Sequence, residues 1–200
     1  MIKHRGFFGS TGSGKTTLAE YMGRQSDGLV VFFNAQEESL RSAWAACGKN
    51  DRLDVVVPSG RAALRNYIPS ADDEMAQLEL NVLVNRMFAL PATKTVLIVD
   101  EAQVYAPEGK DQGALQKVAR RGRRYNIELW TVSQHPADIS KKVVRQLHEH
   151  YIFELRYSDE YLKKYGIDAD KLHQIHKERG KYSYAVWNGA DLRGCDPLDL

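Results

Sequence analysis

The sequence predicts an α/β domain in which helices cover both faces of a mostly parallel central sheet. Short apolar runs alternate with amphipathic stretches of helical length along the chain, as they do in such folds. A glycine-rich segment, GSTGSGKT, joins the first apolar run to the first amphipathic stretch. Because no repeat, low-complexity tract or linker interrupts the pattern, a single domain over residues 1–200 is expected.

The apolar runs are short enough to be buried strands. The expected strands are Gly6–Phe8, Leu29–Phe33, Leu53–Val57, Thr95–Asp100, Ile127–Ser133, His150–Leu155 and Tyr182–Trp187. The third of the expected helices starts with acidic side chains, which the helix dipole favours there, and Pro91 ends it. The expected helices are Lys15–Arg24, Glu37–Cys47, Asp72–Leu90, Asp111–Tyr125 and Ala137–Leu147, with two short ones around Glu160 and Leu172.

The composition indicates a soluble intracellular protein. A hydrophobic content of 43% suffices for a core, and the net charge of +2 is too small for a protein that simply coats nucleic acid. The two cysteines, Cys47 and Cys195, have no metal-ligand or disulfide spacing. A secretory signal is not expected, because the first residues run into the glycine-rich segment without a long apolar stretch, and the apolar runs are too short to span a bilayer.

The glycine-rich segment matches the phosphate-loop pattern G-x-x-x-x-G-K-[ST] between a strand and a helix. Glycines let the backbone N–H groups surround a phosphate, and the following helix adds the positive end of its dipole. Lys15 is expected to neutralise the β and γ phosphates, and the Thr16 hydroxyl to hold Mg²⁺. The expected ATP-binding residues are Gly9, Ser10, Thr11, Gly12, Ser13, Gly14, Lys15, Thr16 and Thr17.

Polar side chains end two later strands of the expected sheet. Asp100 and Glu101 follow the apolar run Val96–Val99, where a cation would justify two acids at a buried strand end. Asp100 is the expected Mg²⁺ ligand and Glu101 the expected base for water, although Glu101 could instead cap the next turn. Gln134 follows the strand Ile127–Ser133 and is expected to contact the γ-phosphate or the attacking water, and so to sense which nucleotide is bound. These features predict a three-layer P-loop NTPase domain of the RecA/ASCE-like kind.

The segment from Gly109 to His150 is basic, because it contains nine Lys or Arg residues and only four acidic residues. Its densest part has four arginines in five positions, which repel one another unless an anion is nearby. A neighbour's γ-phosphate or a DNA backbone would serve, and a solvated helix end is the plainer alternative. The candidates for DNA or trans-phosphate contacts are Arg120, Arg121, Arg123, Arg124, Lys141 and Lys142.

Three segments together resemble the HerA/FtsK group of P-loop motor ATPases: VLIVDEAQ, GRRYNIELWTVSQHPADISKKVVRQL and KERGKYSYAVW. The resemblance implies a ring-forming, usually hexameric ATPase that moves DNA, most like the genome-packaging ATPases of tailless, membrane-containing viruses. It also implies that Arg123, or failing that Arg124, is a finger that completes a neighbour's ATP site. The second and first segments are similar to Zot-type assembly ATPases of filamentous phages as well.

The resemblance implies catalytic roles for Lys15, Glu101, Gln134 and Arg123, with ATP and Mg²⁺ as cofactors. It further implies that double-stranded DNA stimulates the ATPase, and that a capsid or viral membrane protein docks the ring. The expected location is the host cytoplasm, with association with the virion as well. A Zot-like assembly ATPase, a cellular translocase fragment, a small P-loop kinase and a non-hydrolysing scaffold are the alternatives.

Overall fold

The computed structural model describes residues 2–35, 44–47, 62–90, 93–109, 113–155 and 159–199. In this part of the chain, one nine-stranded sheet has the order β3-β4-β2-β5-β6-β1-β7-β8-β9. Its strands are β1 (Arg5–Phe8), β2 (Gly28–Phe33), β3 (Ala45–Cys47), β4 (Ala62–Tyr67), β5 (Thr95–Val99), β6 (Ile127–Ser133), β7 (Glu149–Ile152), β8 (Tyr184–Trp187) and β9 (Leu192–Cys195).

The first seven strands in that order pair in parallel, and only β8 and β9 run antiparallel to their neighbours. The strand β6 lies between β1 and β5, with Phe8 of β1 opposite Ser133 and Val99 of β5 opposite Thr131. Because parallel strands end at the same sheet edge, the segments after β1, β5 and β6 are brought together there. The expected mostly parallel sheet is confirmed.

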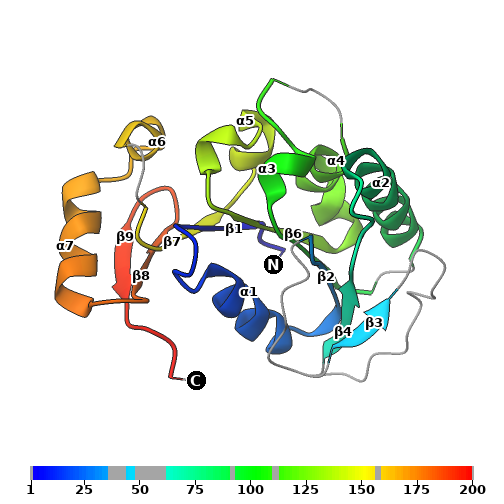
Figure 1. The fold of residues 1–200 in the computed structure, drawn as a ribbon, viewed down its shortest axis with the longest axis horizontal. Coiled ribbons are helices and arrows are strands. Elements are labelled where there is room, and N and C mark those ends of the chain that lie inside the picture. Colours follow the sequence, from blue (N-terminus) through cyan, green and yellow to red (C-terminus); the bar gives the residue numbers. More distant parts are fainter. Residues whose placement is uncertain are drawn as a thin grey trace.

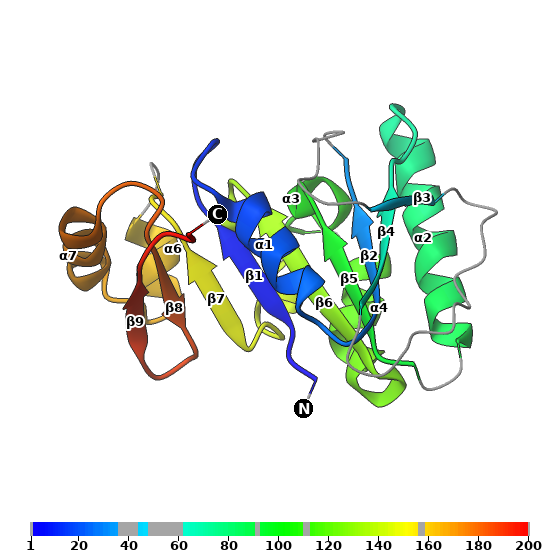
Figure 2. The ribbon, with the colours of Figure 1, turned by 90° about the horizontal axis from the view of Figure 1, so that it is seen from below.

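Helices form a layer on each side of the sheet (Figures 1 and 2). One face carries α1 (Lys15–Arg24), and the other carries α2 (Asp73–Ala89), α3 (Ala102–Tyr105), α4 (Ala114–Arg121) and α5 (Lys141–Val144). Beside β8 and β9 lie α6 (Asp159–Lys164) and α7 (Ala169–Arg179), and two 3₁₀ turns cover Gly122–Tyr125 and Pro136–Asp138. The three-layer α/β fold class is therefore confirmed.

Alternate residues of the central strands enter different cores, as the strand period of two requires. Val31, Phe33 and Leu97 point into the larger core, which α2 and α4 complete. Val30 and Phe32 point into the smaller core under α1. The central strands are thus buried on both faces, which explains why they read as continuous apolar runs in the sequence.

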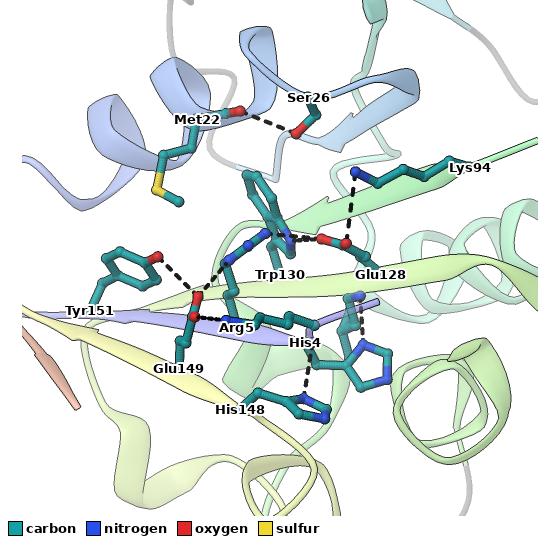
Figure 3. A network of polar contacts seen from close by, with 12 residues as sticks. His4, Arg5, Met22, Ser26, Lys94, Glu128, Trp130, His148, Glu149 and Tyr151 are labelled. Carbon is teal, nitrogen blue, oxygen red and sulfur yellow. Dashed lines mark hydrogen bonds and ion pairs between the residues drawn. The ribbon is translucent and has the colours of Figure 1, made fainter. Parts of the chain in front are cut away.

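An ion-pair network links β6, β1 and β7 at the α1 face (Figure 3). Arg5 donates to Glu149 through Nε and to Glu128 through Nη1, each over 2.9 Å. The Trp130 indole N–H also donates to Glu128 over 3.0 Å, so the carboxylate of this buried residue is paired. The network joins side chains from three adjacent strands and so supports the register that sets the positions of their ends.

Several expected element boundaries were wrong. The expected helix Glu37–Cys47 ends in a strand, because Ala45–Cys47 pair with β4, and its earlier residues mostly lie outside the described ranges, as does the expected strand Leu53–Val57. The expected helix Ala137–Leu147 is broken into a 3₁₀ turn and α5, because Ile139 adopts an extended conformation and pairs with Pro107. The strands β4 and β9 were not expected. Among described residues, no helix is long and apolar enough to cross a bilayer.

Candidate active site

The phosphate loop follows β1 directly and ends at Gly14, the residue that caps the start of α1. Gly14 has φ 101°, a left-handed conformation that favours glycine. Gly9 is confined in space, since an added Cβ would lie 2.6 Å from Cβ of Phe153. Within the described atoms, the buried hydroxyl of Ser13 has no hydrogen-bond partner. The loop therefore has the close-fitting backbone and the unsatisfied donor that an oxygen-rich anion would suit.

Lys15 begins α1 and is only 7% exposed. Its Nζ donates to the carbonyl oxygen of Ser10 over 2.9 Å, so the ammonium group curls over the loop itself. Thr16 and Thr17 follow in the first helical turn, where the helix dipole is positive. Three features that attract phosphate, a cation, a helix start and the loop amides, therefore meet at one place.

Asp100 and Glu101 follow β5, which ends at Val99, one residue earlier than the expected strand. Asp100 is 3% exposed, and its Oδ1 accepts the backbone N–H of Glu101 over 3.0 Å. Glu101 has φ 47° and ψ 47°, a left-handed conformation that costs a non-glycine residue about 1 kcal/mol or more. Such strain is characteristic of functional positions, and here it turns the chain so that both carboxylates face the phosphate loop's pocket.

Gln134 joins the phosphate loop to Glu101. Its Oε1 accepts the hydroxyl of Thr11 over 2.6 Å, and its Nε2 donates to Oε1 of Glu101 over 2.9 Å. The strand order explains this geometry, because β6 lies between the strands that carry the other two residues. The sequence predicted Gln134 for this edge, but not that it would bridge the two other elements.

A second glutamine, Gln103, was missed by the sequence analysis. Its Nε2 donates to the other carboxylate oxygen of Glu101, and its Oε1 accepts the hydroxyl of Ser133 over 2.6 Å. Both oxygens of Glu101 are thus hydrogen-bonded to amide groups, which fix the carboxylate plane. The signal was present in VLIVDEAQ, where Gln103 is the last residue, but a glutamine two residues after an acid has no recognisable pattern.

A pocket of about 400 Å³ gathers most of the expected site. The expected residues that line it are Thr11, Gly12, Gly14, Lys15, Thr16, Thr17, Asp100, Glu101 and Gln134. Gly9, Ser10 and Ser13 do not line it, and the last two instead face a neighbouring cavity between the loop and α7. The remaining walls include an aromatic and apolar end formed by Phe153, Tyr182, Tyr184, Pro197 and Leu198.

The oxygen ligands in this pocket suit a hard divalent cation. The Thr16 hydroxyl and the Asp100 carboxylate both line it. In the described ranges, no three His, Cys, Asp or Glu side chains gather closely enough to hold a metal. A cation here would therefore take its other ligands from phosphate oxygens and water, as Mg²⁺ does beside nucleotides.

Arg123 lies at the other edge of the sheet, away from the phosphate loop. It belongs to the 3₁₀ turn that precedes β6, whereas the loop and Gln134 lie past the ends of β1 and β6. Seven residues of β6 separate the two edges by about 20 Å at the usual strand rise. Arg123 therefore does not reach the pocket of its own chain.

The Arg123 side chain is exposed and its guanidinium is only loosely held. Its Nη1 lies 3.4 Å from Nε2 of His148. The other ring nitrogen of His148 accepts the backbone N–H of His4 over 3.1 Å, so a neutral His148 carries its proton on Nε2 (Figure 3). The N–H groups of Arg123 Nη1 and His148 Nε2 then point at each other. Burial, together with the nearby charge of Arg123, lowers the pKa of His148. The contact leaves the guanidinium available to an anion.

The other candidate basic residues differ in their exposure and in whether an ion pair holds them. Arg120, Arg121 and Arg124 are exposed at the end of α4 and in the turn that follows. Lys141 pairs with Glu108 over 2.7 Å, and its backbone N–H donates to the same carboxylate. Lys142 is exposed on α5. The arginine cluster therefore remains the stronger candidate for an anionic partner.

Sequence comparison finds distant relatives, although no protein-family model matches the chain. The DNA double-strand break repair helicase HerA of Pyrococcus furiosus is 26% identical over 80 residues, which are 38% of this chain and 14% of HerA. Protein P9 of Pseudoalteromonas phage PM2 is 26% identical over 145 residues, which are 72% of this chain and 64% of P9. The chain thus matches only about a seventh of the length of HerA.

Structure comparison extends over the whole chain. The genome-packaging NTPase B204 of Sulfolobus turreted icosahedral virus 2, solved with ATP-γ-S, has a TM-score of 0.71 over 98% of each chain at 15% identity. The N-terminal domain of zonular occludens toxin from Neisseria meningitidis has a TM-score of 0.53 over all of this chain and 96% of that one, also at 15% identity. The fold is therefore that of a P-loop NTPase, and the resemblance to the HerA/FtsK group of P-loop ATPases is confirmed.

Proposed function

We propose that this chain is an ATP-hydrolysing motor that moves double-stranded DNA, and that its task is to package a viral genome into a capsid. The observation that carries the hydrolytic part is the convergence of Lys15, Thr16, Asp100, Glu101 and Gln134 on one pocket. The proposed movement of DNA and packaging of a genome are supported by the resemblance to HerA and by the whole-chain likeness to B204.

The proposed chemistry assigns each residue one task. The loop amides and Lys15 bind the β and γ phosphates and offset their charge. Thr16 and Asp100 would hold Mg²⁺, whose charge further stabilises the phosphate oxygens. Glu101 accepts a proton from the attacking water, and the amides of Gln103 and Gln134 keep its carboxylate in place. Transfer of the γ-phosphoryl group to water then yields ADP and phosphate.

The proposed ring would bring a further cationic group to this pocket. Arg123 lies at the opposite sheet edge and cannot complete the site in its own subunit. In a ring, it would face the pocket of the next subunit and stabilise the charge that develops on the γ-phosphate. A hexamer is the expected assembly on the family resemblance, with duplex DNA held mainly through its phosphates. The proposed location is the host cytoplasm and the virion, with a capsid or viral membrane protein as docking partner.

A Zot-like assembly ATPase is the second candidate, because the zonular occludens toxin domain shares the fold. The higher TM-score of B204 favours packaging. A small P-loop kinase would need an acceptor site beside the γ-phosphate. The carboxylate of Glu101 is instead held by the side-chain amides of Gln103 and Gln134, an arrangement that suits the activation of water better than the activation of an acceptor hydroxyl.

Phosphate release with and without duplex DNA tests the proposal, with molecular mass measured in solution in parallel. We expect turnover, its stimulation by duplex DNA and ring assembly with nucleotide. Displacement of a third strand from a triplex by the advancing protein would measure translocation itself. If duplex DNA did not change the rate of phosphate release and no third strand were displaced, the motor function would be contradicted. ATP hydrolysis would then be the only part of the proposal that stands. Consumption of ATP only with an added acceptor would favour the kinase.

A further inference from the structure

The aromatic end of the pocket is a wall without a role in phosphate chemistry. Phe153, Tyr182 and Tyr184 contribute rings to it, and Pro197 and Leu198 of the chain end complete it. The rings of Phe153 and Tyr184 lie 5.3 Å apart at an angle of 32°. Phe153 and Tyr184 also pack in the core beneath α1, which anchors this side of the wall.

This wall touches the phosphate loop. A Cβ added at Gly14 would lie 3.4 Å from Cε1 of Phe153 and 3.8 Å from Cδ1 of Tyr182. These are ordinary van der Waals distances, so the rings begin where the loop ends. A molecule whose phosphates occupy the loop would therefore meet the rings with the part that lies beyond its phosphates.

Tyr182 is unusual within the wall. The residue is 49% exposed, and its φ of 69° is a left-handed conformation that tyrosine rarely adopts. The Nζ of Lys181 lies 4.8 Å from the centre of its ring and so covers part of the ring. A large exposed aromatic in a costly backbone conformation, at the mouth of a pocket, points to a binding surface.

We propose that the aromatic end binds the nucleobase, that Tyr182 holds it by stacking, and that the site accepts purine nucleoside triphosphates in general. The proposal rests on the proposed nucleotide site and names its base subsite. Aromatic rings bind every base through its π-face and do not distinguish one base from another. The side chains named for this wall carry no amide, carboxylate or amino group, and their polar atoms are the hydroxyls of Tyr182 and Tyr184. A hydroxyl can donate or accept a hydrogen bond, so it does not by itself distinguish adenine from guanine.

The chemistry of the wall sets how far bases can be distinguished. A site that hydrogen-bonds a substrate group rejects an analogue without that group by about 10⁴- to 10⁵-fold, whereas an apolar pocket achieves only about 10- to 200-fold. Adenine and guanine offer similar stacking surfaces. We therefore expect kcat/KM for ATP and GTP to differ by less than about 200-fold, and a preference of a thousandfold or more would overturn the proposal.

The effect of Tyr182 on base binding is tested with Tyr182→Ala, with Tyr182→Phe as the matched control. Binding is measured for a non-hydrolysable ATP analogue and for inorganic tripolyphosphate, which has the phosphates but no base. We expect Tyr182→Ala to weaken binding of the analogue on the order of tenfold, with tripolyphosphate binding unchanged and Tyr182→Phe close to wild type. Because Tyr182 is half exposed, its loss should leave the fold intact.

Three results would overturn the stacking role. They are unchanged analogue binding in Tyr182→Ala, an equal loss for tripolyphosphate, which would mean that the ring only shapes the loop, and a loss in Tyr182→Phe as large as in Tyr182→Ala. Since binding is measured without hydrolysis, this test is separate from that of the motor. A wild-type protein that binds the analogue but releases no phosphate would remove the proposed function and leave the base subsite standing.

Discussion

Gln134 donates a hydrogen bond of 2.9 Å from Nε2 to Oε1 of Glu101, while its Oε1 accepts the hydroxyl of Thr11. One side chain therefore contacts both the phosphate loop and the acid at the end of β5. When phosphates enter the loop, any displacement of Thr11 acts on the amide that orients Glu101. The site thus contains a direct mechanical link between nucleotide binding and the group proposed to activate water.

Replacement of Glu101 by glutamine should separate binding from turnover. Glutamine has nearly the same shape but cannot accept the proton of the attacking water, so ATP should bind with the wild-type affinity while phosphate release falls at least about 100-fold. The measurements are nucleotide binding at equilibrium and single-turnover phosphate release. Normal turnover in this variant would assign the base to another residue.

Gln134→Leu should lower kcat about 10- to 100-fold, because the carboxylate of Glu101 then loses one of its two amide donors. The KM for ATP should change little, since the phosphate-binding groups stay in place. Steady-state phosphate release separates the two constants. Gln174→Leu is the matched control, because Gln174 is an exposed residue of α7 that pairs with Glu178. An equal loss in both variants would contradict a special role for Gln134.

Subunits that lack Arg123 should be rescued by subunits that lack Lys15. Arg123→Ala removes the proposed finger and Lys15→Ala removes phosphate binding, so each variant alone should be inactive. A mixed ring contains interfaces at which an intact pocket meets an intact finger, and it should recover a fraction of the wild-type ATPase rate. The measurement is phosphate release over a range of mixing ratios. No recovery at any ratio would argue against a finger acting between subunits.

The unfolding free energy should fall as the pH drops from 6.5 towards 4. Burial lowers the pKa of His4 and of His150 to about 4, so both are neutral when folded and protonate in the unfolded chain at higher pH. Because the unfolded state then binds more protons, each histidine should cost on the order of 2 kcal/mol between pH 7.5 and pH 5. Urea unfolding at the two pH values measures this loss.

His150→Phe provides the matching variant for that measurement, since His150 lies among Phe8, Tyr161 and Tyr165. The stability loss on acidification should be smaller in this variant than in the wild type. His173→Gln, on the exposed side of α7, should keep the full loss. The same pH dependence in all three proteins would show that burial of His150 is not a source of it.

The sequence predicted the helices and strands whose own residues carry a complete signal, such as a motif or an apolar run. The helix Lys15–Arg24 and the strand Ile127–Ser133 were placed at their observed bounds, because a motif starts the one and seven buried residues form the other. The strand β4 was missed because AALRNY is only partly buried at an outer position of the sheet. The strand β9, LRGC, has no apolar run and depends on pairing with β8.

Local sequence motifs identified most residues of the site, but they did not predict the contacts that individual side chains make there. Most of the loop residues named from the sequence line the pocket together with Asp100, Glu101 and Gln134. The role of Gln103 was not predictable, because its contacts join the ends of two strands that are adjacent only in the folded sheet. Tyr182 was assigned to a strand and given no function, since a ring near the loop requires the chain to return from β7 through α7. Neighbours far apart in sequence determine both residues' environments.

The separation of Arg123 from its own phosphate loop also has a consequence for assembly. In the proposed ring the two surfaces that meet are different, so the contact between subunits would be head-to-tail. Such a contact closes into a ring only if its rotation is a full turn divided by a whole number of subunits. In such an assembly every catalytic centre is shared by two chains. Dilution below the dissociation constant of the ring would then switch off hydrolysis, and the specific activity would rise steeply with protein concentration.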